Sequence, residues 1–215
     1  MWMKYRWWII GIVVVTLIAA ALWGPIVSNV EQPKYQVVET SGHFEIRDYA
    51  PMIVAEVEIP GERRDAMGKG FRIIADYIFG NNSAAQKVPM TAPVTQQDSE
   101  KIAMTAPVTQ QGDGSTWKVR FIMPSSYTME TLPKPHNPGV KLKEIAARRY
   151  AVIRFSGSPG EDSLKARARE LTAWVRTKNL TPVSEPVYAF YNPPWTLPFL
   201  RRNEVMVEIL RSPAD

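Results

Sequence analysis

The chain has 215 residues, of which 45% are hydrophobic and 22% are charged, and its formal net charge is +5 at pH 7. It contains no cysteine, which excludes disulfides, thiolate metal sites, cysteine nucleophiles, covalent c-type haem attachment and a lipid-modified cysteine. The lysines and arginines are scattered and accompany no nucleic-acid-binding motif, so we expect no nucleic-acid partner.

The first predicted element is an apolar helix at the start of the chain. Residues 7–27 carry no charge and would span roughly 31 Å as a helix, about the thickness of a bilayer core. Lys4 and Arg6 precede this run, and tryptophans stand at both of its ends, as in membrane anchors that keep positive charge inside. We therefore predict that residues 1–29 form a single transmembrane helix in the cell (inner) membrane. Residues 30–215 would then form a soluble domain on the extracytoplasmic side. A cleaved signal peptide is the alternative, because Ala19, Ala20 and Ala21 offer a cleavage site.

Strands and then a helix are predicted next. Residues 35–40, 43–49 and 52–61 alternate apolar with polar side chains and are rich in valine and isoleucine, which is typical of half-buried strands. In residues 61–82 the apolar side chains fall three and four apart instead, and Gly80 follows them as a stop signal. This pattern predicts an amphipathic helix that Gly68 and Gly70 weaken.

Residues 87–111 contain a repeat, in which MTAPVTQQ occurs twice, fourteen positions apart. Each copy places four apolar residues at one parity: Val88, Met90, Ala92 and Val94 in the first, and Ile102, Met104, Ala106 and Val108 in the second. This parity predicts two strands, each with one apolar face, joined by a turn at residues 96–100. We interpret the repeat as part of a sheet and not as a catalytic loop.

The order of elements then restarts. Strands are predicted within residues 115–123 and 140–157, a helix within 158–179, and further strands within 187–210 around a proline-rich loop. Ser158 and Glu161 have the spacing of a capping box at the start of that helix. The fold class is therefore α+β, with two similar strand–helix–strand halves, two flanking α-helices, and an antiparallel sheet curled into a barrel or an open saddle.

Several motifs occur in one order along residues 35–210. They are K-[IV]-x-M-T-A-P-V, which is present twice, then VRFIMPSSYTMETLPKP, ARRYAVIRFSG, and YNPPW followed by RRNEV. In these motifs the chain resembles the SOUL/haem-binding protein family. The resemblance implies a twisted antiparallel β-barrel of two pseudo-symmetric halves, so that residues 30–215 form a SOUL-type domain with affinity for haem or a related tetrapyrrole.

The resemblance also implies where the ligand binds, because the family's pocket lies beside the first helix and the late Y-x-P-P loop. Carried onto this chain, the helix contributes Arg64, Met67, Phe71, Ile74 and Ala75, and the loop contributes Tyr191, Pro194, Trp195, Phe199 and Arg201. The apolar side chains would cover the faces of the macrocycle, and arginines, including Arg63, would meet its propionates. The competing interpretation is that the helical stripe is ordinary core.

No side chain is assigned as a metal ligand. His43 and His136, the two histidines, are both predicted to be solvated loop residues. Asp48 stands where some family members carry histidine, so the resemblance implies non-covalent, hydrophobic haem binding with weak or absent axial ligation, or with Tyr191 as a phenolate ligand.

No catalytic motif is present. Residues 61–71 lack the spacing of a phosphate-binding loop, and two histidines argue against a catalytic triad or a facial-triad iron site. We therefore expect a membrane-anchored tetrapyrrole-binding protein that faces the cell envelope and buffers, carries or senses haem. Two alternatives stay open: an enzyme that modifies a tetrapyrrole, and a binding module for other amphiphilic small molecules.

Overall fold

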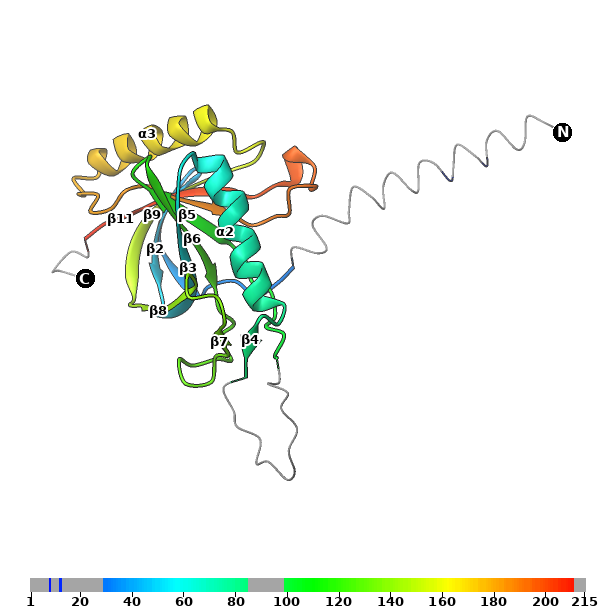
Figure 1. Cartoon of the computed structure of the whole chain (residues 1–215). Helices are drawn as coiled ribbons and strands as arrows, with labels where there is room; N and C mark the ends of the chain where they lie inside the picture. Colours follow the sequence, from blue (N-terminus) through cyan, green and yellow to red (C-terminus); the bar gives the residue numbers. More distant parts are fainter. Residues whose placement is uncertain (1–7, 9–11, 13–28, 85–98, 211–215) are drawn as a thin grey trace, which may run out of the picture.

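The computed structural model of the chain describes residues 8, 12, 29–84 and 99–210 (Figure 1). In chain order its elements are β1 (Tyr35–Ser41), β2 (Phe44–Tyr49), β3 (Met52–Pro60), α2 (Arg63–Ile78), β4 (Asn82–Ser83), β5 (Val108–Gly112), β6 (Thr116–Ile122), β7 (Lys134–Pro135), β8 (Lys141–Ile145), β9 (Arg148–Phe155), α3 (Glu161–Thr177), β10 (Val187–Phe190), the short 3-10 helix η1 (Pro198–Leu200) and β11 (Asn203–Glu208).

Nine of the strands form one antiparallel sheet in the order β1-β2-β9-β11-β10-β5-β6-β3-β8, and β4 pairs with β7 separately. The sheet curls, and α2 and α3 cover its convex face (Figure 1). Among the described strands β1 and β8 are edges that do not pair with each other, so the sheet is a half-barrel. The predicted α+β class with two flanking helices is confirmed, and the open form of the sheet replaces the closed barrel.

The two halves of the sheet have matching strand orders: β2-β9-β11-β10 from one end and β8-β3-β6-β5 from the other. α2 packs on β3 and β6, with β5 next in the sheet, and α3 packs on β9 and β11, with β10 next in the sheet. The strand that comes just before each of these units in the chain pairs with the other unit. β2 precedes β3 but pairs with β9, and β8 precedes β9 but pairs with β3. Only residues 50–51 link β2 to β3, and only residues 146–147 link β8 to β9. These short links hold the two ends of the curled sheet close together.

Helical spacing explains how each helix covers the sheet. Leu164, Ala168, Leu171 and Val175 form the buried stripe of α3 and pack on β9 and β11. On α2, Ile74 and Ile78 are buried against β3 and β6, and Gly70 lets the helix approach Val119 so closely that a Cβ would lie 2.7 Å from a methyl carbon of that valine. A third apolar cluster, around Tyr49, Val152 and Met206, lies on the concave face that the helices leave uncovered.

Two local predictions are wrong. Residues 102–107 of the second repeat copy are not a strand: Met104 is 39% exposed, and β5 begins only at Val108. The reason is Pro107, which has no N–H to donate to a ladder, so regular pairing starts after it. The first copy and residues 96–98 of the predicted turn lie outside the described residues. The capping box is also wrong, because α3 begins at Glu161 with Gly160 as its N-cap and makes no side-chain cap bond.

The predicted transmembrane helix, residues 1–29, falls almost entirely outside the described residues. In the part of the chain that the structure describes, no helix is long and apolar enough to cross a membrane.

Candidate functional site

The concave face of the half-barrel contains two adjoining cavities. The first, which we call the sheet cavity, has a volume of about 290 Å³ and is lined by Pro33, Tyr49, Met52, Val54, Pro107, Thr109, Gln111, Arg120, Ile122, Ile145, Ala146, Arg148, Tyr150, Val183, Ser184, Val187, Tyr191, Met206 and Glu208. The second, which we call the strap cavity, has a volume of about 570 Å³ and is lined by Glu31, Gln32, Pro33, Lys34, Ala50, Pro51, Met52, Ile53, Thr105, Ile122, Met123, Pro124, Ser125, Tyr127, Thr128, Glu144, Ile145 and Ala146. The two cavities adjoin, because five residues line both of them: Pro33, Met52, Ile122, Ile145 and Ala146.

Residues 30–34 cross this concave side, and we call them the strap. The strap is held by backbone hydrogen bonds, in which Ala106 N donates to Glu31 O at 2.9 Å and Ala50 N donates to Lys34 O at 3.1 Å. The Glu31 carboxylate also accepts from Ser125 N at 2.9 Å. These bonds fix the strap as one wall of the strap cavity.

Three tyrosines from different strands face the sheet cavity. Strand alternation explains their position: Tyr49 on β2, Tyr150 on β9 and Tyr191, which continues the alternation of β10, all belong to the concave-face cluster. The rings of Tyr49 and Tyr150 meet edge to face with their centroids 5.6 Å apart. The cavity therefore offers aromatic surface held by a sheet and not by a loop.

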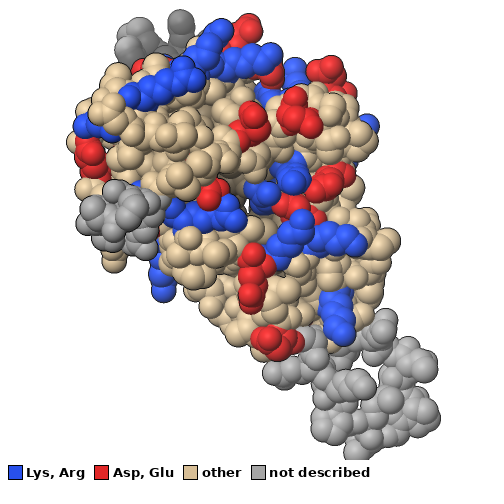
Figure 2. Space-filling model, turned by 90° about the vertical axis from the view of Figure 1, so that its left-hand side faces the viewer, with Lys and Arg blue, Asp and Glu red and all other residues tan. Residues whose placement is uncertain are grey.

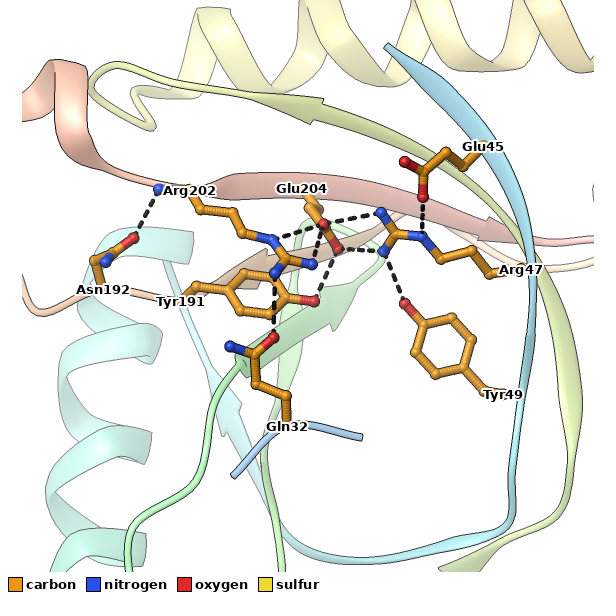
Figure 3. Close-up of polar contacts among 8 residues, drawn as sticks. All are labelled: Gln32, Glu45, Arg47, Tyr49, Tyr191, Asn192, Arg202 and Glu204. Atoms are coloured by element: carbon orange, nitrogen blue, oxygen red, sulfur yellow. Dashed lines mark hydrogen bonds and ion pairs between the residues drawn. The ribbon is translucent and has the colours of Figure 1, made fainter. Parts of the chain in front are cut away.

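A buried ionic network stands behind these rings (Figure 3). Glu204 is fully buried, and its carboxylate accepts hydrogen bonds from Arg47 at 2.9 and 3.2 Å and from Arg202 at 2.7 and 3.0 Å. The hydroxyl of Tyr191 donates to the same carboxylate at 2.9 Å, and Arg47 also donates to the hydroxyl of Tyr49 at 3.1 Å. The network joins β2, β10 and β11, so it fixes the tyrosines in place.

The same network keeps the two buried tyrosines protonated. Burial, followed by the neighbouring negative charge of Glu204, raises the pKa of both Tyr49 and Tyr191 well above the ordinary value of 10. Tyr191 is thus a neutral phenol that donates to Glu204. This state disfavours the phenolate role predicted for Tyr191.

Two arginines lie at the cavity wall beside the tyrosines. Arg120 contacts Glu56 and donates to Gln111 at 3.0 Å, and Arg148 pairs with Glu208 while 42% of its side chain stays exposed. A guanidinium carries five N–H donors, so each arginine has donors left for a ligand carboxylate beyond these bonds. Basic and acidic side chains are interspersed around a hollow on the side of the molecule that Figure 2 shows, and this face carries no broad field of one sign.

The described residues include no group of three or more histidine, aspartate or glutamate side chains that could hold a metal ion. His43 contacts Glu170 at 2.9 Å, and His136 contacts Ser83 at 2.7 Å and Asn81 at 3.0 Å. Neither histidine lines either cavity. The cavities thus fit the apolar faces and the carboxylates of a tetrapyrrole, and they offer no histidine to its metal.

The residues predicted from the sequence fall into three places. Tyr191 lines the sheet cavity. On α2, Ile74 and Ala75 are buried, Met67 is half-buried against the same core cluster, Phe71 is 37% exposed with its ring 5.2 Å from Phe121, and Arg64 is exposed. Pro194, Trp195, Phe199 and Arg201 lie in the loop between β10 and β11, where Trp195 and Phe199 are 66% and 70% exposed. None of these α2 or loop residues lines the sheet cavity or the strap cavity, and the α2–loop site itself stays a prediction.

The sequence reasoning missed the ionic network and the cavity arginines. A signal was present, because Arg47 with Tyr49 and Arg202 with Glu204 are spaced two apart within predicted strands. That spacing places each pair on one face of its strand. Charged residues that share a face with valines and methionines indicate a polar site inside the curl.

Comparisons with known proteins agree with this fold. A family model described as SOUL heme-binding protein matches residues 30–208. The crystal structure of the EcmrR C-terminal domain is similar at 12% identity and a TM-score of 0.57, over 82% of this chain and 98% of that one. The crystal structure of a hydrolase from Listeria innocua is similar at 14% identity and a TM-score of 0.52, over 80% of this chain and 94% of that one. At such identities the two structures show the fold alone, and no curated protein matches the chain.

Proposed function

This chain belongs to the SOUL heme-binding protein family, and on that premise we propose that its domain binds haem or a related tetrapyrrole, without a covalent bond, in the sheet and strap cavities. One observation supports this placement most directly. Two adjoining cavities on a rigid concave sheet combine tyrosine rings and aliphatic side chains with arginines at the wall. The strap cavity, at about 570 Å³, also falls within the range of roughly 300–1,000 Å³ that is usual for small-molecule sites.

Each part of the cavity has a physical role in this proposal. The tyrosine rings and the shared aliphatic wall of Met52, Ile122 and Ile145 cover the apolar faces of the macrocycle. Arg120 and Arg148 donate to its carboxylates. Bound haem supplies the redox and ligand-binding chemistry of its iron, while the chain's own residues orient the ligand and exclude water.

We also propose that residues 7–27 anchor the domain to a membrane and that the domain faces the extracytoplasmic side, where it buffers, carries or senses the ligand. The support is the charge-free length of this run and the position of Lys4 and Arg6 before it.

A haem titration of residues 30–215, followed in the Soret band, tests the binding proposal. Ala146 lines both cavities and is exposed, so Ala146→Trp places a large ring in their shared wall without removing any core contact. Ala147→Trp is the matched control, because Ala147 is exposed and lines neither cavity. We expect haem affinity to fall severalfold in the first variant and to stay unchanged in the second.

A third variant separates this placement from the one predicted from the sequence. The double change Trp195→Ala and Phe199→Ala leaves both cavities intact, so we expect unchanged haem affinity. Loss of affinity here, with none in Ala146→Trp, would assign the ligand to α2 and the loop. No Soret shift with excess haem would refute tetrapyrrole binding, and equally tight binding of amphiphiles without a macrocycle would assign the cavities to a broader ligand class.

A further inference from the structure

The loop between β10 and β11, residues 193–201, presents a cluster of exposed apolar side chains, and we call it the aromatic loop. Trp195 and Phe199 are 66% and 70% exposed, and Leu197 and Leu200 are each 38% exposed. Single exposed apolar residues are common on soluble proteins, whereas these four come from one loop of nine residues, and clustered exposed apolar side chains mark interaction surfaces. None of the four side chains lines the sheet cavity or the strap cavity.

The aromatic loop is held rigidly in this exposed form. Arg201 donates to the backbone carbonyls of Thr196 and Pro194, each at 2.6 Å. Gly157 N donates to Pro198 O at 2.9 Å, which ties the loop to the chain after β9. These bonds fix the backbone from which Trp195 and Phe199 project.

The base of the aromatic loop is bonded to the chain that follows the apolar run. Arg202 donates to the side-chain oxygen of Gln32 at 3.1 Å (Figure 3). Gln32 is five residues after Val27, the last residue of the charge-free run, and five residues span at most about 17 Å in any conformation. In Figure 1 the loop, in orange, and the first described residues of the domain, in blue, lie on the same side of the molecule.

The chemistry of the loop suits the surface of a bilayer. Tryptophan is enriched at membrane interfaces, where its ring sits among the headgroups, and exposed phenylalanine and leucine gain by entering the adjacent acyl region. Residues 192–203 contain no aspartate or glutamate, and Arg201 adds a positive charge next to the aromatic side chains. Anionic headgroups attract such positive charge.

We propose that the aromatic loop inserts into the interface of the same bilayer that holds the N-terminal anchor. The proposal rests on the anchoring part of the proposed function and is independent of haem binding. The anchor alone gives the domain one point of contact with the bilayer. A second contact through Trp195 and Phe199 gives the half-barrel one fixed orientation on the membrane.

The absence of cysteine from the chain gives a direct test with the full-length protein. Phe199→Cys carries a unique spin label in the loop, and Ala173→Cys carries one at an exposed position of α3 as the matched control. Both proteins are reconstituted in vesicles of phosphatidylcholine and phosphatidylglycerol in equal parts. The accessibility of each label to oxygen, which concentrates in lipid, is compared with its accessibility to a water-soluble nickel complex.

We expect the oxygen-to-nickel accessibility ratio to be severalfold higher at position 199 than at position 173. Equal ratios at the two positions, in protein that floats with the vesicles, would overturn the loop proposal while the anchor stands. Protein that fails to float would refute the anchor and the loop contact together, and a Soret titration of the same variants reports separately on haem binding. Replacing Trp195 and Leu200 by serine in the labelled Phe199→Cys protein should lower the ratio at 199, which excludes an effect of the label alone.

Discussion

The buried carboxylate of Glu204 makes the sharpest stability prediction. Glu204→Gln keeps the shape of the side chain but removes the charge that Arg47 and Arg202 share. Arg47 has only 1% of its side chain exposed, so its guanidinium cannot recover hydration. Removing one partner of a buried ion pair costs about 3–5 kcal/mol. Because Arg202 is 19% exposed and Glu45 also pairs with Arg47 at 2.6 Å, we expect the lower end, about 3 kcal/mol.

Urea denaturation of residues 30–215 at neutral pH, followed by circular dichroism, measures this loss in the free energy of unfolding. Glu208→Gln is the matched control on the same strand. It breaks the pair with Arg148, in which the two side chains are 42% and 22% exposed, and exposed pairs contribute at most about 1 kcal/mol. For a domain of this size a loss of about 3 kcal/mol lowers Tm by roughly 6–12 °C.

A double variant shows whether the charge is the cause. In Arg47→Met, one of the two cations that Glu204 compensates is already gone, so adding Glu204→Gln should cost at least about 1 kcal/mol less than it does in the wild type. If the costs simply add, or if Glu204→Gln costs no more than Glu208→Gln, the network does not stabilise the fold through its charges and our reasoning is wrong.

Two further predictions concern α2 and the second buried acid. Gly70→Ala should destabilise the domain, because the new Cβ would lie 2.7 Å from a methyl carbon of Val119. Such overpacking costs about 1–3 kcal/mol, and the better helix propensity of alanine offsets roughly 0.5–1 kcal/mol of that cost. Gly68→Ala, where only an Arg72 nitrogen lies within 4 Å at 3.7 Å, should stabilise by about 0.5–1 kcal/mol; thermal melts of the two variants check this contrast, and equal signs would contradict it. Burial raises the pKa of Glu56, but hydrogen bonds from Lys143 and Arg120 outweigh it and leave the pKa below the ordinary value of 4.5. The stability that this lowered pKa contributes is present above pH 4.5 and is lost as the pH falls through the lowered pKa. Urea titrations below pH 4.5 should therefore show a smaller loss in the free energy of unfolding for Glu56→Gln than for the wild type. An identical loss in both proteins would refute the role of Glu56.

Periodicity predicted the elements that bury one clear face. The stripe of α3 and the alternation of β2, β3 and β9 are read directly from the sequence, because each has an apolar side that must be covered. The prediction was wrong at residues 102–107, because the alternation of apolar residues indicated a strand whose pairing Pro107 prevents. Whether the sheet closes depends on pairing between edges that are distant in the sequence, and local patterns carry no information about it.

The candidate site was harder to predict, because its parts come from both halves of the chain. Tyr191 was predicted together with Trp195 and Phe199 as one aromatic group in a proline-rich loop. In the structure Tyr191 still follows the alternation of β10 and points into the concave face, while Trp195 and Phe199 belong to the excursion beyond it. We therefore grouped these residues because they are close in the sequence, although the alternation of β10 extends only to Tyr191 and the two others lie on a different part of the domain. Tyr49, Tyr150 and the two arginines of the cavity were missed because they meet only after β2, β6 and β9 have been brought together in the curled sheet.

The exchange of β2 and β8 between the two helix-covered units also determines how this chain can fold. Neither unit can complete its own sheet, because the outer strand of each is supplied by the other from roughly 100 residues away, and such distant pairing slows folding. The two units are therefore arranged like the two chains of a symmetric dimer that exchange a strand, within a single polypeptide.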